Sequence, residues 1–208
     1  MGRGIGRVIL LAAWVAVLAG CGGDGSGGSG GRGDADNANL IVNGSFEDPD
    51  IAPGISAGFV GGWEILHDPI PGWSPVDGNG FEIFDNVIAS SGAVWQAYEG
   101  DQFAELDADA NGGISQTITT VPQASYYLYF AYSPRPGGSS ATNTVRILLD
   151  GINIDNVAAD GIAASPSWTL YRYSFIAAGT STTVGFTAAG DSDGVGGLLD
   201  DVMVYPNP

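Results

Sequence analysis

The chain has 208 residues, of which 23 are acidic and only 6 are basic, and its formal net charge at pH 7 is −17. A surface this acidic repels phosphate backbones, so the composition argues against a nucleic-acid partner and favours cations or uncharged polymers. Cys21 is the only cysteine, which excludes an intramolecular disulfide and a cluster of thiolate metal ligands.

The N-terminal segment is typical of an export signal. Arg3 and Arg7 precede twelve consecutive apolar residues, Val8 to Ala19. This stretch is shorter than the roughly 20 residues that a membrane-spanning helix needs, but it fits the apolar core of a signal peptide. Leu18-Ala19-Gly20-Cys21 follows and resembles the lipobox of bacterial lipoproteins. We therefore predict a cleavable signal peptide over residues 1–20 and lipidation of Cys21.

Residues 21–38 are predicted to form a flexible tether, because after Cys21 they are almost entirely Gly, Ser, Asp and Asn. Loss of the two leader arginines changes the net charge of the mature chain to −19. Several acyl chains on one residue anchor a protein stably in a bilayer. We therefore expect export and a lipid anchor in the bacterial cell envelope, with the domain in the periplasm or at the cell surface. Gly22, where an inner-membrane retention Asp would stand, favours the outer membrane.

From residue 39 to 208 the sequence contains short β-type runs separated by Gly, Pro, Asn and Asp. Alternation is clearest where Tyr171, Tyr173 and Phe175 share one face and polar residues share the other. The spacing predicts one all-β domain, an antiparallel two-sheet sandwich. The expected strands cover residues 40–42, 81–87, 102–107, 114–121, 125–132, 144–149, 169–177, 182–188 and 198–205.

Seven segments stand out together in chain order: Asn39–Glu47, Pro71–Trp73, Phe81–Phe84, Gly100–Asp107, Ile114–Thr117, Ala131–Gly137 and Gly197–Val202. In combination they resemble the DUF642 family of exported bacterial proteins and plant cell-wall proteins. More widely, they resemble galactose-binding-like jelly-roll modules such as carbohydrate-binding modules of families 4, 9 and 22. The resemblance covers residues 39–205 and implies a jelly roll, an association with cell-wall glycan or polysaccharide, and a structural Ca²⁺ where the first and last strands meet.

Carried over residue by residue, the resemblance implies that Glu47 and Asp200 donate to this calcium ion, with Asp201 as a further ligand. Calcium takes six to eight oxygen ligands from carboxylates and carbonyls in flexible loops. Two carboxylates brought together without a cation would repel each other. The alternative is that these side chains are solvated strand ends.

A sugar-binding surface needs flat aromatic faces and charged groups that hydrogen-bond hydroxyls. In the segment 102–107, Ala104 and Leu106 are expected to face the core, which leaves Phe103, Glu105 and Asp107 on the opposite face. The alternative for any aromatic residue of a sandwich is a place in the core. The candidate ligand-binding residues are Glu82, Trp95, Tyr98, Glu105, Tyr127, Tyr129 and Arg135.

Two other patterns are partly similar to a catalytic site and to a calcium-binding loop. Glu105-Leu-Asp-Ala-Asp109 is superficially similar to the alternating carboxylates of jelly-roll glucanases, but Asn-Gly-Gly follows at once and favours a turn. Asp107–Gly112 matches the first half of an EF-hand loop, yet the twelfth position is Ile118 instead of Glu, so we also interpret it as a turn. The lone His67 has no Cys or Lys partner in the sequence and is interpreted as a surface residue.

The sequence thus predicts a lipid-anchored carbohydrate-binding module without catalytic activity, stabilised by calcium. A protein-protein or extracellular-matrix interaction module without sugar binding is the first alternative. A small polysaccharide-cleaving enzyme is the second.

Overall fold

The computed structural model describes residues 38–51, 55–56 and 59–207. The predicted signal peptide, Cys21 and nearly all of the tether lie outside the described residues. The described residues form no helix that is long and apolar enough to cross a membrane. They form twelve strands in two antiparallel sheets, which confirms the predicted two-sheet sandwich.

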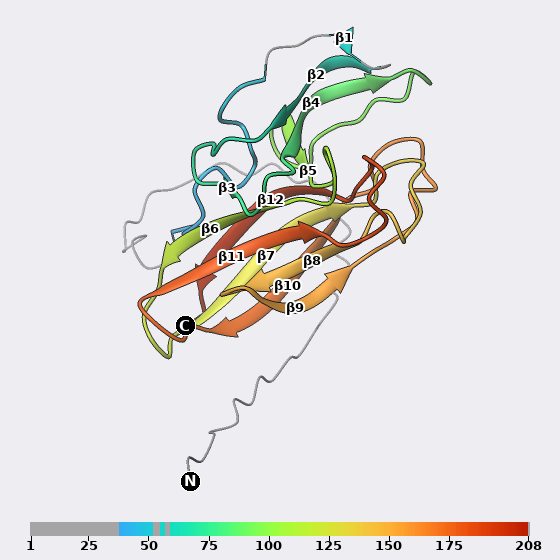
Figure 1. Ribbon diagram of the computed structural model, residues 1–208. Helices are drawn as coiled ribbons and strands as arrows, with labels where there is room; N and C mark the ends of the chain where they lie inside the picture. Colours follow the sequence, from blue (N-terminus) through green and yellow to red (C-terminus); the bar gives the residue numbers. More distant parts are fainter. Residues whose placement is uncertain (1–37, 52–54, 57–58, 208) are drawn as a thin grey trace, which may run out of the picture.

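The two sheets stack as the layers of the sandwich (Figure 1). The larger sheet has seven strands in the order β1 (Ile55–Ser56), β2 (Phe59–Leu66), β4 (Phe81–Ala89), β5 (Gln102–Glu105), β12 (Leu198–Pro206), β7 (Ser125–Ser133) and β10 (Thr169–Ile176). The smaller sheet has five strands in the order β3 (Ser74–Pro75), β6 (Gly113–Thr119), β11 (Ser181–Ala188), β8 (Val145–Leu149) and β9 (Ile152–Val157). In Figure 1, β1, β2 and β4 extend beyond the smaller sheet at one end.

The main core lies between the sheets and follows from strand alternation. On β7 the inward positions hold large apolar side chains, with Phe130 at the centre. The Phe130 ring is stacked on Tyr173 of β10, with centroids 5.9 Å apart, and meets the edge of Phe186 of β11 at 5.0 Å. Because side chains alternate along a strand, Tyr127 and Tyr129 point to the other face of the larger sheet.

A second, smaller cluster covers the outer side of β4 and β5. Phe84 and Phe103 lie directly opposite each other on these strands, and their rings are stacked with centroids 5.4 Å apart. Trp95, from the connection after β4, packs on the same cluster. The expected alternation of residues 102–107 is therefore present, but all six side chains are buried, because this outer side has a core of its own.

The structure differs from the expected strands in five places, of which two are the two-residue strands β1 and β3, absent from the expected set. Leu40–Val42 is not a strand, although the Leu40 N–H donates to the Val204 carbonyl of β12. Strand β2 was not expected, because Gly61 and Gly62 interrupt its pattern; the register shifts at this point. Strand β9 was also missed; only half of its six residues are apolar, and it lies at a sheet edge.

Candidate functional site

Four of the seven predicted ligand residues come together in one buried cluster. They are Glu82, Glu105, Arg135 and Trp95. Glu82 on β4 and Glu105 on β5 are direct cross-strand neighbours, and both carboxylates face Arg135, which follows β7. The Arg135 Nη1 donates to Glu105 Oε2 at 2.9 Å and lies 3.6 Å from Glu82 Oε2. Glu82 is 6% exposed and Glu105 is 0% exposed. We call Glu82 and Glu105 the acid pair; Arg135 is the cation that faces it.

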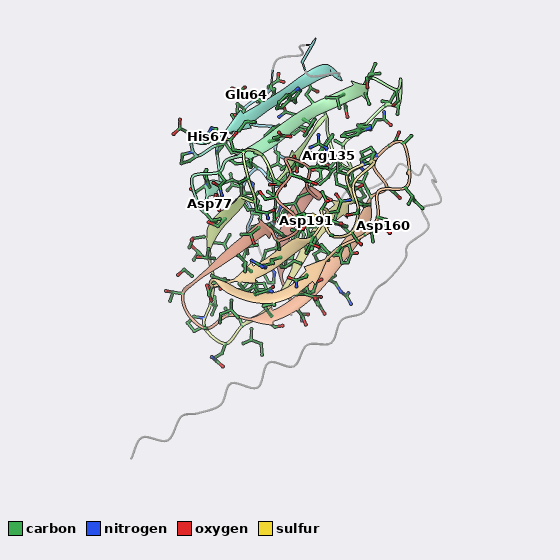
Figure 2. All side chains as sticks on the ribbon, turned by 45° about the vertical axis from the view of Figure 1, so that its right-hand side comes forward. Glu64, His67, Asp77, Arg135, Asp160 and Asp191 are labelled. Atoms are coloured by element: carbon green, nitrogen blue, oxygen red, sulfur yellow. The ribbon has the colours of Figure 1, made fainter. Side chains whose placement is uncertain are left out.

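Aromatic rings and loops enclose this arginine. The guanidinium carbon lies 5.5 Å from the Phe84 ring centroid and 5.8 Å from that of Trp95. The Trp95 indole donates to the Ala164 carbonyl, and the Arg135 Nη1 reaches the Gly194 carbonyl at 3.4 Å. The loops that follow Arg135 and Asp160, both labelled in Figure 2, are joined by main-chain hydrogen bonds of Gly161 with Gly137 and Gly138. Arg135 therefore joins several loops to the sheet.

Burial controls the titration of the acid pair. It raises the pKa of Glu105 well above its usual range, and the nearby Glu82 charge adds to this effect while Arg135 opposes it. Burial also raises the pKa of Glu82, against the lowering effects of its hydrogen bond to Glu105 and of Arg135. Two carboxylates facing one guanidinium favour a shared proton, because full ionisation would leave one negative charge without a partner.

The predicted calcium ligands hold one short segment from two sides. Glu47 Oε1 accepts the main-chain N–H groups of Asp101 and Gln102 at 2.9 and 2.8 Å. Asp200 Oδ2 accepts those of Tyr98 and Glu99 at 2.7 and 3.0 Å. The two carboxylates are thus brought to the same five-residue segment, residues 98–102.

The carboxylates around residues 98–102 supply only part of the oxygen ligands that a hard cation such as calcium needs. Asp200 is fully buried and belongs to none of the ion pairs in the described residues; burial raises its pKa to about 8. Burial also raises the pKa of Asp201, and the Glu99 charge adds to this. Among the described residues, however, no group of three or more Asp, Glu, His or Cys side chains is placed to hold a metal. A calcium ion here would need main-chain carbonyls as well.

The remaining predicted aromatic residues lie on the surface. Tyr98 is 45% exposed and meets the Trp168 ring at 6.4 Å. Tyr127 and Tyr129 are half-buried on the outer side of β7, with ring centroids 6.0 Å apart. Tyr205 of β12 contacts Tyr129 at 6.3 Å, and the Arg172 guanidinium of β10 lies 4.9 Å above the Tyr127 ring.

We call Tyr127, Tyr129, Arg172, Met203 and Tyr205 the tyrosine face. Met203 and Arg172 both pair with Tyr129 in the strand register, so these side chains are neighbours across three strands. The sequence reasoning missed Arg172, Met203 and Tyr205. The sequence shows that these residues alternate with apolar ones along their strands. Their alignment with Tyr127 and Tyr129, however, depends on strand order and on the irregularity between Asp200 and Met203.

The expected turns are present at one end of the sandwich. Asp107 and Asn111 form an isolated bridge, and the Asp107 carboxylate accepts the N–H groups of Asp193 and Gly194. His67 lies at the surface, with its Nε2 2.7 Å from Asp109 Oδ2; both side chains are at least half exposed. These contacts organise loops and do not assemble a nucleophile.

The two antiparallel sheets form a jelly-roll sandwich. The chain belongs to the DUF642 family, described as a protein of unknown function, whose profile matches residues 39–205. The resemblance found in the sequence is therefore confirmed.

Solved structures of the same fold have low sequence identity. A cyclase from Fischerella sp. TAU, in complex with 4-(1H-indol-3-yl)butan-2-one, is 16% identical, with a TM-score of 0.54 over 82% of this chain and 98% of that chain. TmCBM61 in complex with β-1,4-galactotriose is 16% identical, with a TM-score of 0.49 over 82% of this chain and 99% of that chain. A family 35 carbohydrate binding module from Clostridium thermocellum is 16% identical, with a TM-score of 0.43 over 70% and 98% of the two chains. A search of curated proteins found no match.

Proposed function

We propose that this protein is a non-catalytic carbohydrate-binding module that holds polysaccharide on its tyrosine face. The observation that carries the proposal is the group of Tyr127, Tyr129 and Tyr205 on the outer side of the larger sheet, three half-buried tyrosines in which the Tyr129 ring neighbours the other two. Tyrosine offers an apolar ring face and a polar hydroxyl at low entropic cost, which suits a sugar ring with its C–H and O–H groups.

The strands position these rings before any ligand arrives. Tyr127 and Tyr129 alternate with the core residues Tyr126, Leu128 and Phe130, so their backbone is fixed by the sandwich. A preformed surface loses little conformational freedom on binding, and this loss is one of the main costs of association. The tyrosine face therefore differs from a random set of exposed aromatic residues.

The burial of the acid pair supports a binding role over a hydrolytic one. A glycosidase needs two carboxyl groups that reach the bond to be cleaved. Glu82 and Glu105 are both buried and face Arg135, whose guanidinium lies against the Phe84 and Trp95 rings. This burial favours a structural role for the two glutamates over direct contact with a polymer, and we propose that role for them.

We further propose a structural calcium ion at the segment 98–102, with Glu47, Asp200 and Asp201 as its carboxylate ligands and main-chain carbonyls completing the shell. The support is geometric, because Glu47 and the buried Asp200 hold the same segment from two sides. Burial raises the pKa of Asp200, and a cation beside it would favour its ionised form. The ion would hold the N-terminal segment, this loop and β12 together. It would take no part in contacting sugar.

The export signal and Cys21 complete the proposal. A lipid on Cys21 and a Gly-rich tether would hold the module at the cell envelope, most simply at the outer membrane, within reach of envelope or extracellular glycan. The competing function is an interaction module for protein or matrix that uses the same face. A glycan-binding experiment separates the two.

The test is retention of the mature chain in affinity electrophoresis on a panel of soluble polysaccharides. Tyr205→Ala is expected to weaken retention about tenfold, the effect of losing one aromatic contact of roughly 1.4 kcal/mol. Ile162→Ala, at an exposed apolar residue on another part of the surface, is the matched control and should leave retention unchanged. Equal retention of both variants, or no retention on any polysaccharide, would rule out this function.

A further inference from the structure

Arg172 is the arginine of the tyrosine face, and it is one of two arginines in the described residues that form no ion pair. The described residues contain three arginines, and Arg135 is held by the acid pair. Arg146 and Arg172 are exposed, and no carboxylate of the described residues lies within 4.0 Å of either guanidinium. The chain has 23 acidic residues, yet Arg172 lies on the proposed binding surface without an acidic partner among the described residues.

The surroundings of Arg172 keep it available to an anion. Its guanidinium carbon lies 4.9 Å from the Tyr127 ring centroid, and its N–H donors form no hydrogen bond or ion pair with the described residues. The outward neighbours on the same strand, Leu170 and Ser174, carry no charge. The acidic residues of β12 are Asp200, which is buried, and Asp201, which lies at the irregularity of this strand.

We infer that the tyrosine face binds an acidic polysaccharide, with a carboxylate or sulfate group of one sugar on Arg172 and the adjoining sugar rings on Tyr129 and Tyr205. This inference rests on the proposed function and gives its substrate class. A guanidinium binds planar oxyanions through two parallel hydrogen bonds, a geometry that lysine does not reproduce. The tyrosine rings supply the contact with the apolar side of the sugars.

The net charge of the protein opposes such a ligand and gives the interaction a diagnostic dependence on salt. At about 0.01 M salt the screening length is roughly 30 Å, so the many carboxylates repel a polyanion. At about 0.15 M it is roughly 8 Å, so distant charges fade while the contact with Arg172 persists. Affinity should therefore rise from low to physiological ionic strength and fall again at high salt.

The experiment compares matched oligosaccharides on the mature chain. Isothermal titration calorimetry measures binding of an alginate hexamer, of the same hexamer after chemical reduction of its carboxyl groups, and of a sulfated galactan oligomer. The variants are Arg172→Gln, Arg172→Lys and, as the matched control on the other sheet, Arg146→Gln. Circular dichroism establishes that each variant is folded.

The wild-type chain should bind an acidic oligomer about tenfold more tightly than the reduced one, the effect of one charge-assisted pair. Arg172→Gln should remove this difference, Arg172→Lys should restore part of it, and Arg146→Gln should leave it intact. Preference for alginate would identify a carboxylate, and preference for the galactan would identify a sulfate. Equal binding of acidic and reduced oligomers, or an unchanged preference in Arg172→Gln, would overturn the acidic class while leaving the proposed function standing. Failure of every oligomer and polysaccharide to bind would remove both.

Discussion

Replacement of Arg135 by methionine tests whether the acid pair is a structural device. Methionine keeps an apolar contact with Phe84 and Trp95 but removes the only cation that faces Glu82 and Glu105 among the described residues. The two carboxyl groups then remain buried without a positive partner. The domain must either keep both protonated or accept an unpaired charge.

The size of the effect follows from burial. Breaking a buried ion pair by removal of one partner costs about 3–5 kcal/mol, and Glu105 is fully buried. In a domain of this size, 1 kcal/mol lowers the melting temperature by roughly 2–4 °C, so we expect a decrease of roughly 10 °C near pH 8. The decrease should be smaller at pH 5, where the protonated forms are more readily reached.

The pH dependence of the wild-type chain has a defined sign. Burial raises the pKa values of Glu82 and Glu105 in the folded state, so the folded protein binds more protons than the unfolded one above about pH 4.3. The contribution of these two carboxyl groups to stability is therefore fully present below that value and is lost as the pH rises through their raised pKa values. Glu82→Gln mimics the protonated carboxyl and should reduce this slope. The pKa of Asp200 is also raised by burial, so part of the pH dependence of stability should remain in this variant.

Thermal unfolding followed by circular dichroism at pH 5, 6.5 and 8 measures both effects. Glu64→Gln, at an exposed position of β2, is the matched control and should keep the wild-type slope. A melting temperature of Arg135→Met within 2 °C of the wild type at pH 8 would refute the reasoning, since a buried acid pair cannot lose its cation at no cost. A slope in Glu82→Gln equal to that of Glu64→Gln would refute the assignment of the titrating group.

Three further predictions concern the loop and the core. Chelation of calcium should lower the melting temperature by several degrees in the wild type and by much less in Asp200→Asn, as differential scanning fluorimetry would show; no shift in the wild type would exclude the ion. Gly100→Ala should destabilise the domain by about 1–3 kcal/mol in urea unfolding, because the residue has a positive φ of 67° and its new Cβ would collide with the Glu47 carboxylate; wild-type stability would contradict that geometry. Phe130→Ala should cost about 3–5 kcal/mol in the same assay, whereas Val121→Ala at an exposed site should cost under 1 kcal/mol, and similar losses would contradict the placement of the core.

The fold could be predicted because its signals are local. Alternation such as that of Tyr171, Tyr173 and Phe175 reports which face of a strand meets the core, and turn residues report where strands end. The predictions failed where local signals were weak. Gly61 and Gly62 interrupt the pattern of β2, and in the short edge strand β9 the apolar alternation is limited to Ile152 and Ile154.

The candidate site could be predicted only in part, since alternation does not say what covers a face. Phe103 and Glu105 do point away from the main core, as the sequence indicated, but a second aromatic cluster encloses them. A glutamate on an outward position thus became a buried partner of Arg135. Tyr127 and Tyr129 also point away from the main core, but they are only half-buried and remain at the surface.

By itself the sequence determined the all-β class, the family and the strands on which most polar and aromatic candidates lie, because these depend on residue type and spacing along the chain. Only the tertiary structure decided which candidates are neighbours. Strand order places β12 between β5 and β7, and this brings Tyr205 to Tyr129 and Asp200 to the segment 98–102. Pairing between distant strands is set by how two sheets close over a common core, and no local pattern encodes that closure.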